Sequence, residues 1–267
     1  MPGRSPSFAV LTFCGLAIAM PAAAQDIMRH LDLSSPEMTT AEMTREEVAK
    51  LAVAATPGKP ADFTGKRLSG LDLSGLDLSR AVFRAARLNK TNLSGANLDG
   101  AVFDQAWLLD ADMKGASLKD AHLFAAQMQR VTLDRADLSG ARIAADLTNA
   151  SLIGTKLVGA DLAADMKNQS MGLIRAVLKS ARLDGADLST ADLSRADLQF
   201  ASLAKADLSG VSLRGADLSG ADLSGATIAG ADFAGADVAS ARLAAPVGLD
   251  TALNLDKAVN RDRLRRE

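Results

Sequence analysis

The sequence has no tyrosine, one tryptophan and eight phenylalanines among its 267 residues. Aromatic residues make up 3% of the chain, although hydrophobic residues make up 48%. Alanine and leucine therefore supply much of the apolar share, and a core must be built from small side chains of similar shape. The formal net charge is −2. Because sequence-independent nucleic-acid binders carry a basic excess, this near-neutrality predicts no nucleic-acid partner.

Only one cysteine is present, Cys14, and it lies inside the apolar run Phe8–Met20. Arg4 precedes this run, and alanines at 22–24 follow it. Together they form the pattern of a secretory signal peptide over residues 1–24. We expect cleavage between Ala24 and Gln25.

Export through this signal predicts a periplasmic or secreted protein. Cleavage would remove the cysteine, which excludes disulfides and thiol chemistry from the mature chain. The apolar run is too short to cross a membrane, and no other long apolar run follows, so we expect no membrane span in the mature chain. The alternative is an N-terminal anchor that stays attached.

Proline is absent between Pro60 and Pro246, and a period of five residues occupies this interval. From Phe63 to Ile143, every fifth residue is Leu, Phe, Met or Ile. From Leu173 to Leu243, every fifth residue is again apolar. Alanine dominates two positions before each of these central residues, and a short polar residue, often Asp, stands one before.

Units such as ADLSG at 216–220 and 221–225 and ANLDG at 96–100 resemble the pentapeptide-repeat family, A-[DN]-L-[ST]-x. The resemblance covers residues 61–243. It implies an all-β solenoid, a right-handed quadrilateral parallel β-helix with four repeats in each coil. Proline lacks the backbone donor that stacked coils need, so its absence from the array agrees with this fold.

The residues themselves also support 20 residues per coil. Phe63, Phe83 and Phe103 occupy central positions exactly one predicted coil apart. We expect them to form a ladder of stacked rings in the core. Residues 61–243 contain 22 Asp and no Glu, which favours short carboxylates that bond to their own neighbouring backbone in turns.

The period is interrupted twice, near 144–147 and within 163–172. Leu147, Leu152, Leu157 and Leu162 run one residue ahead of the earlier register, and the original register returns at Leu173. We expect one missing residue at the first break and one gained residue at the second, where a bulge or short loop would form. That segment is either a recognition loop or an insertion that the surface tolerates.

Both ends of a solenoid expose unpaired edges that need a cover. Within the N-terminal segment, residues 25–60, helical spacing predicts a capping helix over about 40–55, and Thr44 with Glu47 forms a possible capping box. Residues 244–267 are predicted as a C-terminal helical cap. A terminal helix could also mediate dimerisation, so both a monomer and a dimer stay open.

No constellation of residues predicts catalysis. His30 and His122 are 92 residues apart without a partner motif, and no cluster has the spacing of metal ligands. We therefore expect a protein that is not an enzyme and that has no cofactor. Asp197, Asp217 and Asp237 would form one outward column, which allows a cation-binding alternative.

Some members of the family present an acidic rod shaped like DNA to DNA gyrase, which gives a second alternative. Residues 61–243 contain 22 Asp against 20 Lys and Arg. The array thus lacks the acidic excess of a mimic, and the signal peptide directs it away from the cytoplasm where gyrase works.

Arg67, Arg87 and Trp107 should share one outer column, because they are 20 residues apart. Trp107 could stack with Arg87 as a cation–π pair or contact a partner, since Trp and Arg are enriched at interfaces. We interpret the chain as an exported, non-enzymatic structural or protein-interaction scaffold with an unidentified protein partner.

Overall fold

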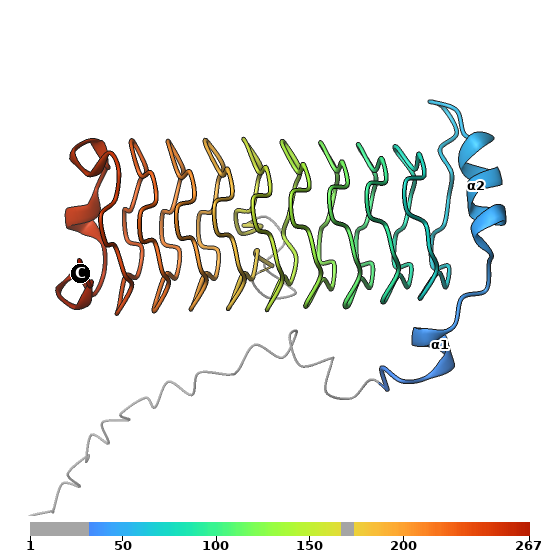
Figure 1. Cartoon of the computed structure of the whole chain (residues 1–267), viewed down its shortest axis with the longest axis horizontal. Coiled ribbons are helices and arrows are strands. Elements are labelled where there is room, and N and C mark those ends of the chain that lie inside the picture. The colour runs from blue at the N-terminus through green and yellow to red at the C-terminus, as the bar shows by residue number, and fades with distance from the viewer. Residues whose placement is uncertain (1–31, 167–173) are drawn as a thin grey trace, which may run out of the picture. The chain divides into compact units, whose positions relative to one another are not determined.

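The computed structural model describes residues 32–166 and 174–267, and these residues form a stack of four-sided coils (Figure 1). The signal peptide with its cleavage site at Ala24 and Gln25, and His30, lie outside the described residues. Each side of a coil contributes one bridging residue, which pairs in parallel with the equivalent residue of the next coil. Among the described residues, no strand is longer than one of these single bridging residues.

The bridges define four outer faces, which we number by their first rung. Face 1 begins at Asp62, face 2 at Arg67, face 3 at Asp72 and face 4 at Asp77. Successive rungs on faces 1 to 3 number ten, and those on face 4 number nine. At the spacing of paired strands, nine steps between ten rungs give a stack about 43 Å long.

Each side forms the same three backbone bonds to the next coil. On the first face-1 side, Phe63 N donates to Val82 O at 2.7 Å and Gly65 N donates to Arg84 O at 2.8 Å. In return, Val82 N donates to Ala61 O at 2.8 Å. This set recurs along the stack, so the coil register is determined by the backbone and not only by the apolar core.

Each corner is a tight turn closed by a bond such as Lys66 N to Phe63 O, at 3.0 Å. The third turn residue has a positive φ, which is +67° at Gly65, as type II turns require. Among the described residues, 19 non-glycine residues also have positive φ. The ladder on both sides of a corner therefore imposes the left-handed conformation even where the side chain disfavours it.

The core consists of the central residue of each repeat and the alanine two before it, which are buried throughout the stack. Phe63, Phe83 and Phe103 lie on one inner side as parallel rings. Their centroids are 5.1 and 4.9 Å apart, with interplanar angles of 15° and 8°. Coil stacking at the strand spacing brings equivalent side chains to this distance.

Two helices precede the coils, α1 (Pro36–Thr39) and α2 (Arg45–Val53). Helix α2 begins with the capping box: Glu47 N donates to Thr44 Oγ1 and Thr44 N donates to the Glu47 carboxylate. It lies at the N-terminal end of the stack (Figure 1), where its Val48 is fully buried. Leu71 and Leu76 of the first coil, larger than the alanine usual at their positions, also pack on the core.

Both irregularities fall at the corner between faces 1 and 2, on successive coils. Face-2 rungs Gln127 and Asp146 are 19 residues apart, so one residue is missing between Arg142 and Asp146. On the next coil, the rung after Asp161 is Val177. Sixteen residues separate these two rungs instead of five, an excess of 11.

The expected gain of a single residue in this second segment is therefore wrong. Leu173, which lies outside the described residues, is in phase with the later repeats, and this coincidence concealed most of the insertion. Asp165 N donates to Ile174 O at 2.8 Å, which joins the two ends of the inserted segment. The carboxylate of the buried Asp165 is 3.7 Å from Arg142 Nη2.

The predicted helical cap over residues 244–267 is also wrong. Residues in this interval form three single 3₁₀ turns, η4 (Leu249–Thr251), η5 (Leu255–Lys257) and η6 (Arg261–Arg263). Between the turns, the ladder continues on to the last rungs, Leu253, Val259 and Arg265. A dimer through a C-terminal helix consequently has no helix to use.

A six-residue period explains these turns: GLDTAL, NLDKAV and NRDRLR occupy residues 248–265. Each unit begins with a residue at positive φ, Gly248, Asn254 or Asn260. One extra residue per side converts the tight turn into a 3₁₀ turn. The α-helix had been expected because Leu249 and Leu253, and likewise Leu255 and Val259, are four residues apart, a spacing that also places residues on one face of an α-helix.

We predict that Leu218→Ala destabilises the stack by about 2–5 kcal/mol, the usual cost of a cavity at a fully buried leucine. Leu218 is 0% exposed. Chemical denaturation followed by circular dichroism measures the change, with the exposed Lys179→Ala as a control expected within about 0.5 kcal/mol of wild type. Equal midpoints for both variants would contradict an apolar axis at position 218.

Candidate functional site

The column proposed from the sequence, Arg67, Arg87 and Trp107, occupies three successive rungs of face 2. All three side chains are half-buried. The structure records no cation–π contact between Arg87 and Trp107 among the described residues. Such a contact occurs instead on face 1, where the Arg142 guanidinium lies 5.9 Å from the centroid of Phe124.

Arg67 is held by the N-terminal segment. Glu42 N donates to Arg67 O at 2.9 Å, and the Glu42 carboxylate lies 3.4 Å from Arg67 Nε and 3.3 Å from Lys66 Nζ. The hydrogen bond from Lys66, and to a lesser extent the charges of Lys66 and Arg67, lower the pKa of Glu42. The segment before α2 thus covers the N-terminal end of face 2.

Four buried side-chain atoms of the described residues have no hydrogen-bond partner; two belong to rungs of face 2 and two to the corner between faces 2 and 3. They are Arg67 Nε, Ser69 Oγ, Arg87 Nε and Gln129 Oε1. Ser69 and Gln129 are 4% and 8% exposed. Buried polar atoms normally find partners, and the exceptions among the described residues gather on face 2 and at its corner with face 3. We call Arg67, Ser69, Arg87, Trp107 and Gln129 the face-2 patch.

A groove of about 540 Å³ runs beside the patch, between the segment that contains α1 and the corner of faces 2 and 3. Asn89 holds that segment in place, because its Nδ2 donates to Met38 O at 3.1 Å while its Oδ1 accepts from Leu109 N at 3.0 Å. Met38 and Leu109 are buried. The groove is therefore bounded by fixed walls.

Charged residues one coil apart line the far side of this groove. Asp110 accepts two hydrogen bonds from Arg130, at 2.7 and 2.8 Å. These bonds, together with the charges of Arg130 and Lys90, hold the pKa of Asp110 below its usual range despite partial burial. The charges of Asp110 and Arg130 on this side of the groove thus neutralise each other.

The sequence did not single out two aromatic side chains that lie outside the core, Phe124 and Phe200. Both depart from the central position that the other phenylalanines of the array occupy, which is the signal that could have identified them. Phe200 is 61% exposed and adopts a φ of +59° at a corner. Its ring lies where a Cβ at Gly220 would come within 2.5 Å, so an alanine there would displace the ring.

The five-residue repeats of this chain match those of a known protein family. The profile of pentapeptide repeats matches in eight copies, over residues 67–105, 77–115, 108–140, 144–163, 173–210 and 206–243. The chain belongs to the pentapeptide-repeat family. Among the described residues of this pentapeptide-repeat protein, no helix is long and apolar enough to cross a membrane.

Solved structures of other pentapeptide-repeat proteins are similar to this one. HetL, involved in heterocyst differentiation regulation in the cyanobacterium Nostoc sp. strain PCC 7120, is 30% identical in sequence. The match covers 76% of this chain and 82% of the HetL chain, with a TM-score of 0.38. A thylakoid lumen protein of Arabidopsis thaliana is 38% identical, covering 38% and 68%, with a TM-score of 0.31. QnrB1, a plasmid-mediated fluoroquinolone resistance protein, is 16% identical, covering 77% and 91%, with a TM-score of 0.39. No curated protein matches the chain.

The acidic side chains of this pentapeptide-repeat protein mainly serve its turns. Asp217 Oδ1 accepts from Ser219 N at 3.0 Å, and the same contact recurs at most outward aspartates. Glutamate would place its carboxylate one methylene too far for this bond, which explains its absence from the array. The repeats thus use Asp as a local backbone acceptor.

Asp197, Asp217 and Asp237 do form consecutive rungs of face 2, but each has protein partners. Arg175 Nη2 is 3.1 Å from Asp197 Oδ2, and Gln199 donates to Asp217. Burial raises the pKa of Asp217, but the bonds from Ser219 and Gln199 and the charge of Arg175 outweigh it and lower that pKa. The described residues bring together no group of three or more His, Cys, Asp or Glu that could hold a metal ion.

We predict that the stabilising effect of Arg130 depends on pH. The pKa of Asp110 is lowered in the folded protein, so the pair stabilises the fold above the ordinary pKa of about 3.9 and loses this effect as pH falls through the lowered value. Arg130→Gln should therefore reduce stability at about pH 7, by no more than about 1 kcal/mol because the pair is exposed.

The free energies of unfolding of wild type and Arg130→Gln, measured at about pH 7 and at about pH 3, check this dependence. The difference between the two proteins should shrink at the lower pH. A difference that stays constant or grows on acidification would show that Arg130 acts through packing and not through the charge of Asp110.

Proposed function

We propose that this pentapeptide-repeat protein is an exported, non-enzymatic scaffold that binds a protein partner through the face-2 patch. The observation that carries the proposal is that all four buried side-chain atoms without a hydrogen bond among the described residues lie on face 2 or at its corner with face 3; of these, Arg67 Nε has an ion-pair contact with Glu42 at 3.4 Å. These atoms have almost no accessible surface, so a partner would bond to them after the side chain turns outward, and such a bond would recover the desolvation cost of a buried polar group.

The chemistry of the patch suits a protein surface. Arg67 and Arg87 supply guanidinium donors, Gln129 supplies an amide acceptor, and Trp107 supplies a flat apolar area next to them. Because the two arginines are only half-buried, rotation of their side chains can bring the guanidinium groups to carboxylates or carbonyls of the partner. Arg and Trp together are typical of interface hot spots.

Charge compensation supports a scaffold over the alternative of a DNA mimic that binds gyrase. Aspartates of neighbouring coils pair with basic residues: Arg214 Nη1 lies 2.7 Å from Asp232, and Arg130 Nε lies 2.7 Å from Asp110. A mimic of the DNA backbone needs uncompensated negative charge. The array instead carries 22 Asp against 20 Lys and Arg.

We predict that a photoreactive phenylalanine analogue at position 107 forms discrete protein adducts in intact cells, because Trp107 lies at the centre of the patch. The same analogue in place of Thr132, an outward residue of face 3, is the matched control and should give none. Arg87→Glu combined with the probe at 107 should reduce adduct yield at least about tenfold, the loss expected for a hot-spot residue. Identical adducts from both positions, or none from position 107, would refute the face-2 interface.

Export is tested separately. We predict that the full chain, expressed in a Gram-negative host with a C-terminal tag, appears in the periplasmic fraction with Gln25 at its N-terminus. Replacing Ala24 with Phe should block cleavage and accumulate the longer precursor, because signal peptidase requires a small residue there. Cytoplasmic protein that retains residues 1–24 would overturn the export proposal and leave the face-2 proposal standing.

A further inference from the structure

Among the described residues, the N-terminal segment donates to backbone carbonyls of the first coil on two faces. On face 2, Glu42 N donates to Arg67 O at 2.9 Å. On face 3, the Arg45 guanidinium donates to Asp72 O at 2.6 Å and to Ser74 O at 2.8 Å. These donors replace the backbone groups that a preceding coil would supply.

The face-4 edge of the first coil has no such cover among the described residues. The carbonyl oxygens of Asp77 and Ser79 accept no hydrogen bond, and Asp77 N donates none. Every later coil uses the equivalent three groups: Asn97 O accepts from Leu78 N, Asp99 O accepts from Arg80 N, and Asn97 N donates to Leu76 O. The unmade bonds therefore have a known geometry.

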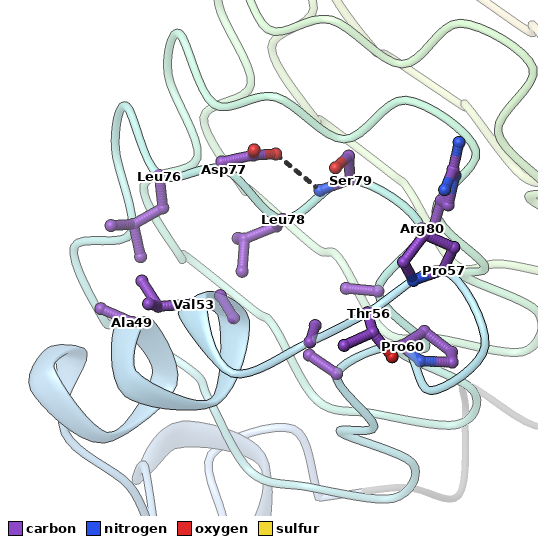
Figure 2. Close-up of a pocket in the computed structure, with 14 residues that line it drawn as sticks. Ala49, Val53, Thr56, Pro57, Pro60, Leu76, Asp77, Leu78, Ser79 and Arg80 are labelled. Carbon is purple, nitrogen blue, oxygen red and sulfur yellow. Dashed lines mark hydrogen bonds between the residues drawn. The ribbon is translucent and has the colours of Figure 1, made fainter.

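A cavity of about 350 Å³ runs along this unpaired edge (Figure 2). One wall is the first-coil side Leu76–Ala81, and the opposite wall is formed by the second half of α2 and by residues 55–61. Figure 2 shows Val53 close to Leu76 and Leu78 at one end of the cavity. Val53 is 88% exposed, although it is an apolar residue that ends a helix against the core.

Among the described residues, the face-1 edge of the first coil also has unpaired carbonyls, but the cavity does not lie along it. The carbonyls of Asp62 and Thr64 also lack partners among the described residues, but the chain itself enters the coil there and the cavity does not extend along residues 62–64. Among the described residues, face 4 is the edge where all three backbone groups of the first coil lack partners and a cavity lined in part by Val53, Leu76 and Leu78 lies beside them.

We propose that this edge binds an extended segment of a partner protein, which adds one more side to the first coil by β-augmentation. Two N–H groups of the segment, two residues apart, donate to Asp77 O and Ser79 O, and one of its carbonyls accepts from Asp77 N. An apolar side chain of the segment covers Leu76 and Val53. We assign an extended segment to this edge because it would make the same backbone hydrogen bonds that each coil makes with the next.

The proposed occupant must lack proline at its two donor positions, since proline has no N–H. The site is separate from the face-2 patch, and neither proposal depends on the other. A second copy of this chain as occupant is disfavoured, because α2 lies over the same end of the stack and would prevent a whole coil from stacking there.

The test selects peptides from a displayed library of random 12-residue sequences on the full chain, followed by synthesis of those that bind. We expect the dissociation constant to rise at least tenfold for Val53→Lys and to stay within twofold for Leu51→Lys. Leu51, also an exposed apolar residue of α2, does not line the cavity. Lysine suits the last turn of a helix, so both variants should fold, as circular dichroism and the melting temperature will show.

Backbone pairing is tested with the same peptides N-methylated at alternate residues. Methylation in one of the two registers should weaken binding at least tenfold, because it removes both donors while keeping every side chain. The proposal is overturned if no peptide binds, if Val53→Lys binds as wild type does, or if methylation in either register has no effect. It is also overturned if light scattering shows a concentration-dependent dimer that Val53→Lys abolishes, since the occupant would then be a second copy. Adducts at position 107 should persist in Val53→Lys under either outcome.

Discussion

The parallel backbone ladder between coils is the interaction on which the rest of this protein depends. Its three bonds per side stack each residue on the residue one coil later, so side chains of equal position are forced into columns. Inward columns become the core, such as the rings of Phe63, Phe83 and Phe103. Outward columns become faces whose chemistry is decided one rung at a time.

The same ladder explains why the corners tolerate unfavourable residues. A side chain such as that of Phe200 would not choose a positive φ by itself, but the bonds on both sides of the corner leave no other conformation. Strain is thus distributed over many corners, each compensated by its ladder bonds. Gly220 shows the complementary effect, because it leaves room for the ring of Phe200 that an alanine would fill.

Ladders have ends, and the two ends of this stack are treated differently. At the N-terminus, Glu42 and Arg45 donate to three carbonyls on the edges of faces 2 and 3, and Val48 of α2 fills the end of the core. At the C-terminus, the ladder runs on in wider six-residue sides to Arg265. The uncovered edge at Asp77 and the face-2 patch are the places where the internal bonding is incomplete.

The sequence by itself determined the repeat, the number of residues per coil, the inward column of phenylalanines and the capping box of α2. These follow from spacing, which a regular ladder copies directly into space. The sequence misled where spacing is ambiguous. Leu173 is in phase with the later repeats and thereby concealed an 11-residue insertion. The four-residue spacing from Leu255 to Val259 suggested an α-helix in place of 3₁₀ turns.

Only the tertiary structure decided which polar atoms lack partners. Arg67 and Arg87 were predicted to share a column. That their Nε atoms, the Ser69 hydroxyl and the Gln129 amide oxygen have no hydrogen bond depends on the packing of side chains from several coils and from the N-terminal segment. The open edge at Asp77 likewise depends on where Arg45 reaches. Spacing along a chain specifies which residues become neighbours, whereas the satisfaction of each hydrogen bond depends on distances and angles that only the folded chain defines.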